Sequence, residues 1–450
     1  MSESGPSAKA DGYTEGRREA DAGTEGRSNA DGGTPGGPLR STDEGDAEAV
    51  GFVLKLGRAL HTYGLSADVL EHHLLAMSHR LGLQAQFFTT PTSIFAAFGP
   101  VDRQRTHLIR VYPGDVDLGK LARLDAVTRD VEAGRVRVQE GSAAIEAIMA
   151  LPRTALPLLR VAGYGVASAA SCRILGGGLN EVAVAGVAGL LTGAISLASK
   201  RLPHGTHVFE LAAALVVSFV VTCFAAISDL RLSVPTATLG GVVALVPGLT
   251  VTIAMTELAR RHLAAGTARL SGAFLVFVAI AFGVAVGGEL AQAVVGEVRS
   301  LAPKKLPEWT LTLALGMAPF AFAVLLRARR RDVPWLWGAS VVGYTAVRAA
   351  ALFFGPALAA SLGALVVGVL ANLYDRRGLG PASVVLVPGV LLLVPGSVGY
   401  RSLTSLLDQN VLVGVTAGFT MILTAVAIAA GLLIATVLVP PRGGSWREYD

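Results

Sequence analysis

The chain has 450 residues, of which 52% are hydrophobic and only 16% are charged. Its formal net charge of +5 does not indicate a nucleic-acid partner, because the basic residues gather in short loops between long apolar runs, where they act as topology signals. Cys172 and Cys223 lie isolated within apolar runs, so neither a disulfide nor a metal site is expected.

Residues 1–46 carry a degenerate ten-residue repeat: ADGYTEGRRE, ADAGTEGRSN and ADGGTPGGPL. Such a polar, glycine-rich segment cannot bury enough apolar area to offset its ordering entropy, which predicts a disordered low-complexity tail. The charged-then-apolar pattern of a cleavable signal peptide is absent from the N-terminus. We therefore expect internal helices to drive membrane insertion and the polar N-terminal part to stay in the cytoplasm.

Residues 47–151 predict a small α+β domain. Helically spaced apolar residues occur in VGFVLKLGRALHTYG and in SADVLEHHLLAMSHRLG, where Ser66 is the N-cap candidate. QAQFFTT, SIFAAFG and THLIRVYPG are typical of strands, and residues 118–150 return to a helical pattern. His72 and His79 share a helix face, but no carboxylate or cysteine completes a metal set, so a solvated face is expected.

The rest of the chain predicts a mainly α, polytopic membrane protein. Its uncharged apolar runs reach the ~18 residues that a helix needs to cross ~30 Å of hydrocarbon. Lysine and arginine fall mainly in alternate loops, which predicts that both termini face the cytoplasm. About ten spanning segments are expected near 159–178, 181–199, 208–228, 234–256, 268–289, 307–326, 334–354, 356–374, 381–403 and 411–439.

A repeated tetrapeptide divides these segments into two sets. LVPG occurs at 245–248 and again within LVPGVLLLVPGSVGYRSL at 386–403. With membrane modules at 152–300 and 301–450, each LVPG break falls in the fourth helix of a five-helix set. Because five is odd, the two sets must have opposite orientations, which predicts two inverted five-helix repeats.

The Pro-Gly breaks are the candidate substrate site. Proline removes a backbone donor and glycine leaves the backbone open, and the freed polar groups must be satisfied by protein, water or ligand. The N-terminus of the half-helix after each break also favours a carboxylate. The alternative is a simple packing kink. The candidate substrate-binding residues are Pro247, Gly248, Thr250, Thr252, Pro395, Gly396, Ser397, Tyr400 and Arg401.

Two charged residues near the breaks could take part in transport. Glu257 is the proton-coupling candidate, because low dielectric favours the neutral form of a carboxyl. Arg401 offers a planar fork for a carboxylate. Either side chain could instead lie near a helix end and reach the interface. A nucleophile elbow, a phosphate loop and a zinc signature are all missing from the sequence, so no catalytic residue and no cofactor are expected.

From about Val50 to Pro440 the chain resembles the bacterial threonine/serine exporter family. LGRALHTYGLSADVLEHHLLAMSHRLGL and TTPTSIFAAFG resemble the opening of the family's cytoplasmic region. LVPGLTVTIAMTEL and VLLLVPGSVGYRSL resemble its two helix breaks. The resemblance implies proton-driven export of L-threonine and L-serine by an antiporter of the bacterial inner membrane. The expected partners are these amino acids, protons and the lipid bilayer, with a homo-oligomer left open.

Two other functions compete with amino-acid export. Related two-part systems are associated with export of small dicarboxylates such as succinate, which would make Arg401 central and leave Glu257 without a clear role. A membrane-anchored hydrolase or sensor, acting through residues 47–151, is the alternative from another class. It lacks a recognisable catalytic set.

Overall fold

The computed structural model describes residues 40–152, 157–202, 205, 208–228, 230–298, 300–393, 396–407 and 409–442. It separates Met1–Asp43 from Glu44–Asp450 as two units, and the account below concerns the second. Of the predicted tail, residues 1–39 lie outside the described residues, whereas residues 40–46 belong to the first helix.

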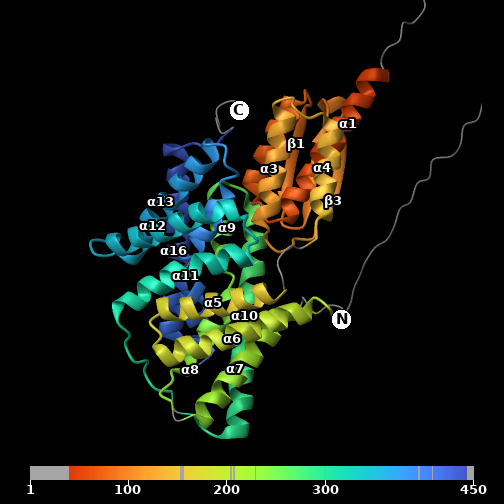
Figure 1. The fold of residues 1–450 in the computed structure, drawn as a ribbon. Helices are drawn as coiled ribbons and strands as arrows, with labels where there is room; N and C mark the ends of the chain where they lie inside the picture. Colours follow the sequence, from red (N-terminus) through yellow and green to blue (C-terminus); the bar gives the residue numbers. More distant parts are fainter. Residues whose placement is uncertain are drawn as a thin grey trace, which may run out of the picture. The chain divides into compact units, whose positions relative to one another are not determined.

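The N-terminal domain has the predicted α+β composition. Helices α1 (Arg40–Thr62) and α2 (Ala67–Arg80) precede an antiparallel sheet with the order β1-β2-β3, and Figure 1 shows α3 and α4 beside this sheet. The predicted helical stretch 118–150 forms two helices because Gly134 adopts a φ of 68° that interrupts it. The remaining bounds are β1 (Ala85–Thr90), β2 (Ser93–Phe98), η1 (Val101–Arg103), β3 (Arg105–Arg110), α3 (Leu118–Glu132) and α4 (Val138–Ala150).

The core of this domain is continuous with the following helices. Alternation along β2 buries Ile94, Ala96 and Phe98 on one face of the sheet, as the two-residue period of a strand requires. The same buried cluster extends to Tyr374 and Val384, which lie on α13 and α14. The domain therefore packs directly on the ends of membrane helices.

The predicted membrane segments coincide with single helices or with broken helix pairs. In the described part of the chain, seven helical spans are long and apolar enough to cross a membrane: α6, α7, α10, α11, α13, α16 and the span Ser383–Ser405, which includes α14 and most of α15. An eighth results if α8 and α9, which are bent by 55°, form one span. A multi-pass membrane protein is thus confirmed. The helices α5 and α12 are not among these spans, so the expected number of ten spanning segments stays a prediction. The bounds are α5 (Pro157–Ile174), α6 (Leu179–Ser199), α7 (Phe209–Ile227), α8 (Val234–Val242), η3 (Val243–Leu245), α9 (Gly248–Ala259), α10 (Leu263–Val295), α11 (Glu308–Leu325), η4 (Arg330–Asp332), α12 (Val333–Ala350), α13 (Pro356–Arg376), α14 (Ser383–Leu391), α15 (Gly396–Leu407) and α16 (Val411–Leu438).

The same helix contacts recur in two halves of the membrane part, the first half being α5 to α10 and the second half α11 to α16. In the first half α6 packs on α8, α7 on α10, and α9 on α10; in the second, α12 packs on α14, α13 on α16, and α15 on α16. Contacts between the halves also come in matched form, since α9 packs on α16 and α10 packs on α15. Helices at equivalent positions along the chain therefore have equivalent neighbours.

Glycine allows the closest of these contacts. A Cβ at Gly287 of α10 would lie 2.2 Å from the carbonyl oxygen of Leu215 on α7. A Cβ at Gly431 of α16 would lie 2.1 Å from the carbonyl oxygen of Ser361 on α13. Small residues let the backbones of membrane helices approach closely, so the equivalent helix pair is closely packed in each half.

We predict that Gly287→Ala and Gly431→Ala each destabilise the protein by about 1–3 kcal/mol, because the added methyl must push two helices apart. The measurement is the thermal unfolding midpoint of the purified protein in detergent. Gly272→Ala on α10 is the matched control, since a Cβ there meets nothing within 4 Å. Equal midpoints for all three variants would contradict the close packing.

Candidate functional site

The two helix breaks meet inside the membrane part. Pro247 is the N-cap of α9, whose first residue, Gly248, is buried. Gly396 begins α15, and a Cβ at Gly396 would lie 3.4 Å from the Cα of Gly248. The N-termini of α9 and α15 are therefore adjacent. Pro395, the predicted proline of the second break, lies outside the described residues.

Polar groups of the protein satisfy part of the backbone that the first break exposes. The carbonyl of Gly241, near the end of α8, accepts hydrogen bonds from Thr192 Oγ1 at 3.1 Å and Ser168 Oγ at 3.4 Å. These hydroxyls come from α6 and α5. Such side-chain support allows a helix to break at membrane depth, and the N–H of Gly248, the first residue of α9, donates to the carbonyl of Val246 at 2.8 Å.

The predicted hydroxyl-bearing residues fall into two groups. One bonds to the backbone of its own helix, and the others lie near a helix break. Thr252 is buried and donates to the carbonyl of Gly248 at 3.2 Å within its own helix. Thr250 and Ser397 are half-buried in the first turns of α9 and α15. Tyr400 is buried in an apolar cluster with Leu245 at the first break.

The charged candidates Arg401 and Glu257 do not join this group. Arg401 is exposed on α15, next to the buried Tyr400. Glu257 is fully buried, but it lies about 13 Å along α9 from Gly248 at the helical rise of 1.5 Å per residue. The structure therefore brings together Pro247, Gly248 and Gly396, and places both charges outside their immediate surroundings.

Glu257 instead joins the N-terminal domain to the first membrane half. Its carboxylate accepts two hydrogen bonds from the guanidinium of Arg269, both at 3.0 Å, and one from the backbone N–H of Ala67 at 2.9 Å. Ala67 is the first residue of α2. Ser66 occupies the predicted N-cap position but makes no side-chain capping bond, so a carboxylate of a membrane helix satisfies this helix end.

Further ion pairs surround this contact. Asp68 of α2 is buried and pairs with Arg260, and Glu71 lies 3.5 Å from the Nδ1 of His262. Both partners lie in the α9–α10 turn, beside Glu257. Sequence analysis missed this network, although acidic residues at the start of α2 and a run of arginines after α9 are its visible signals.

A second set of contacts joins the domain to the other membrane half. The backbone N–H groups of Leu118 and Gly119, at the start of α3, donate to the carbonyls of Leu326 and Arg327 at the end of α11. Asp117 then pairs with the Arg327 guanidinium at 3.1 Å. One helix N-terminus and one helix C-terminus thus satisfy each other's unpaired backbone groups.

The carboxylate of Asp115 forms ion pairs with basic side chains from both membrane halves. Its carboxylate lies within 3.2 Å of Arg160, Lys200 and Arg327. Burial alone would raise the pKa of Asp115, but these cations hold it well below its usual range. The group therefore stays ionised at neutral pH, and its stabilising contribution is present above the unfolded pKa and is lost only in strong acid.

The chain is similar to membrane proteins of one family over most of its length. The family model for the threonine/serine exporter matches residues 51–291, and a second threonine/serine exporter model matches residues 312–438. In the described part of the chain, no three His, Cys, Asp or Glu side chains gather to hold a metal ion. No solved structure matches the chain.

Curated relatives of the chain include fungal membrane proteins. The chain is 26% identical to pheromone-regulated membrane protein 10 of Saccharomyces cerevisiae over 419 residues, which cover 87% of this chain and 54% of that protein. It is 25% identical over 418 residues to the protein of the same name from Eremothecium gossypii, with 87% and 56% covered. It is 26% identical over 425 residues to an uncharacterized protein of Schizosaccharomyces pombe, with 87% and 55% covered. The chain spans about half the length of the curated relatives it matches.

We predict that Arg269→Gln destabilises the protein by about 3–5 kcal/mol, because it leaves the carboxylate of Glu257 buried without its counter-charge. The double variant Glu257→Gln with Arg269→Gln removes both charges and should recover much of this loss. The thermal unfolding midpoint measures both effects, and Arg376→Gln, an exposed arginine, is the control. A single variant no less stable than the control would contradict the buried pair.

Proposed function

The chain belongs to the threonine/serine exporter family, and from this membership we propose that it exports L-threonine and L-serine by proton-coupled antiport. The family consists of membrane transporters rather than enzymes. The observation that carries the proposal is the meeting of two helix N-termini at Gly248 and Gly396. The combined partial positive charge of these two helix ends suits the carboxylate of a small amino acid.

The neighbours of this point favour a hydroxy amino acid. Thr250 and Ser397, half-buried in the first turns of α9 and α15, can exchange hydrogen bonds with a substrate hydroxyl or ammonium group. Thr252 supports the turn from within α9, and Tyr400 closes the apolar side. Pro247 and Pro395 would keep the backbone open at the two breaks.

The site also suits an alternating-access mechanism. The matched helix contacts of the two halves support two inverted five-helix repeats, at 152–300 and 301–450. In such transporters the substrate lies between the repeats at discontinuous helices, which is where α9 and α15 meet. Rocking one repeat against the other would then open the site to each side of the membrane in turn.

Membrane orientation follows from charge. Basic residues are concentrated at the helix ends that contact the N-terminal domain, including Arg160, Lys200, Arg260 and Arg327. By the positive-inside rule this side is cytoplasmic, and so are the N-terminal domain and both termini. The proposed location is the cell membrane.

Two charged residues keep proposed roles at a distance from the breaks. Arg401, one turn into α15, would contact the substrate carboxylate in another state of the transport cycle. Glu257 would exchange the coupled proton when its contacts with Arg269 and Ala67 open. A carboxylate that alternates between an ion pair and a proton is a common element of proton-coupled transport.

We predict that proteoliposomes loaded with radiolabelled threonine lose the label several-fold faster when an inward proton gradient is imposed. External serine should exchange with internal label, whereas succinate should not. Protein-free liposomes and a protonophore provide the controls. Efflux rates that do not change with the proton gradient would contradict proton coupling. Exchange with succinate but not with serine would favour a dicarboxylate substrate instead.

We predict that Gly396→Ala lowers threonine transport by about tenfold, equivalent to ~1.4 kcal/mol, because its Cβ would lie 2.8 Å from Val246 Cγ1 between the breaks. Gly338→Ala, where a Cβ meets nothing within 4 Å, is the control. Arg401→Lys should slow both transport and exchange, and Glu257→Gln should abolish gradient dependence but retain threonine exchange. Membrane insertion should stay normal in all four. Wild-type behaviour of a variant would remove that residue from the mechanism.

A further inference from the structure

A cavity rich in arginine lies away from the helix breaks, where the N-terminal domain meets the second membrane half. Its volume is about 410 Å³, which is within the ~300–1,000 Å³ range of small-molecule sites. Arg129, Asp130 and Arg135 line it from the end of α3 and the loop that follows. Gly378 and Arg442 line it from the α13–α14 turn and from the segment after α16.

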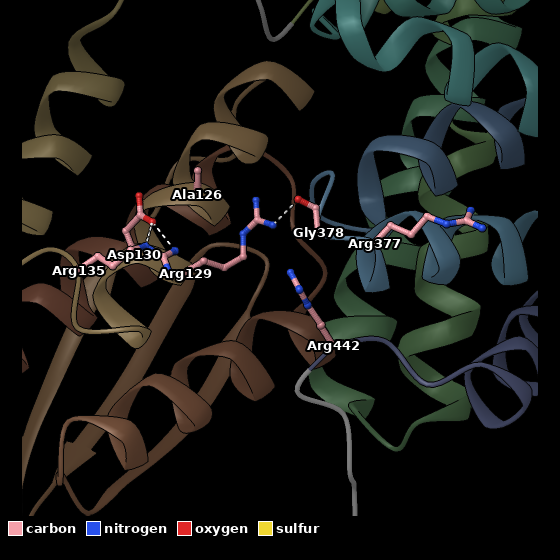
Figure 2. Close-up of a pocket in the computed structure, with 7 residues that line it drawn as sticks. All are labelled: Ala126, Arg129, Asp130, Arg135, Arg377, Gly378 and Arg442. Carbon is pink, nitrogen blue, oxygen red and sulfur yellow. Dashed lines mark hydrogen bonds and ion pairs between the residues drawn. The ribbon is translucent and has the colours of Figure 1, made fainter.

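The guanidinium groups are the main polar feature of this cavity. Figure 2 shows Arg129 and Arg442 turned toward the gap beside Gly378, whereas Arg377 extends away from it. The Arg377 guanidinium lies 5.7 Å from the ring centre of Trp335 instead. Four arginines line the cavity, of which Arg129, Arg135 and Arg442 do not point away from it, and Asp130 is the only carboxylate among the described residues that line it.

The existing contacts leave donors available. Asp130 is held by Arg135, through bonds of 2.9 Å and 2.6 Å. Arg129 pairs with Asp125 at 2.8 Å and donates to the carbonyl of Gly378 at 2.8 Å. Each guanidinium carries five N–H groups, so these bonds use only part of the capacity of Arg129 and Arg135.

Arg442 is the third arginine of this set, and the carboxylates of Asp375 and Glu132 lie within electrostatic reach of it. Its backbone N–H donates to Asp375 at 2.7 Å, which fixes the segment after α16 at the rim of the cavity. Its guanidinium lies against Gly378, since a Cβ at that glycine would be 2.9 Å from Arg442 Nη1. Gly378 has a φ of 70° and no side chain, so the backbone turn leaves room for this approach.

We propose that this cavity binds a phosphate group, held by Arg129, Arg135 and Arg442. The planar fork of arginine matches phosphate oxygens in pairs, and charge-assisted bonds of this kind are about twice as strong as neutral ones. The phosphate could belong to a soluble organic phosphate or to a lipid headgroup. Trp335, under Arg377, marks an amphipathic position of the kind found at a membrane surface.

Phosphate binding in this cavity would act on the contact between the N-terminal domain and the second membrane half. Arg129 belongs to α3, and its bond to Gly378 already crosses from the domain to the second membrane half. A phosphate shared by Arg129 and Arg442 would add a second bridge across the same contact. Its binding free energy would then favour the docked position of the domain, because a ligand stabilises the state that binds it.

The test uses the full-length protein in detergent, titrated with inorganic pyrophosphate and followed by calorimetry. The wild-type protein should bind, and Arg442→Gln should bind about tenfold more weakly, as expected for the loss of a charged hydrogen bond. Arg376→Gln is the matched control, because it removes the same charge from an adjacent exposed position that does not line the cavity. Arg135→Gln, also an exposed side chain, is a second test variant.

A parallel arm separates the two sources of phosphate. The same proteins are placed in nanodiscs of phosphatidylcholine with or without phosphatidylglycerol, and their unfolding midpoints are compared. Pyrophosphate binding that depends on Arg442 supports a soluble ligand. A midpoint raised only by phosphatidylglycerol, and only with Arg442 present, supports a headgroup. Absence of both effects, or equal effects in Arg442→Gln and Arg376→Gln, would overturn the proposal.

Discussion

A backbone polar group in hydrocarbon must find a partner, and this constraint shapes the membrane half of the molecule. Both Pro-Gly breaks expose such groups, so neither break could face lipid. The protein places the two together, with Gly248 and Gly396 in contact range, and supports the first with hydroxyls from Thr192 and Ser168. The partial positive charges of the two helix N-termini at this meeting point favour a negatively charged group.

The same requirement recurs where the N-terminal domain meets the membrane helices. The start of α2 is completed by Glu257, and the start of α3 by the last carbonyls of α11. At both contacts a membrane helix supplies the acceptors that the helix N-terminus lacks, and the ion pair of Asp68 with Arg260 lies beside the first contact. The domain is therefore bonded to both membrane halves through their helix ends.

Local patterns predicted the elements, but not the contacts between them. Apolar periodicity located the helices and strands, and the breaks were visible because proline and glycine act on their own backbone. The role of Glu257 was not visible, because its partner Ala67 is 190 residues away and donates a backbone group that no sequence pattern marks. The arginine cavity was hidden for the same reason, since Arg129 and Gly378 are separated by 249 residues.

These joints place a physical condition on the proposed transport cycle. If one membrane half rocks against the other, a domain bonded rigidly to both would oppose the motion. At least one joint must therefore open in each cycle, at Glu257 or at Arg327. Arg269 lies on α10, in the same membrane half as Glu257, so opening at Glu257 breaks its bond to the Ala67 N–H and can leave the ion pair intact. Docking of the N-terminal domain would then depend on the same carboxylate that pairs with Arg269.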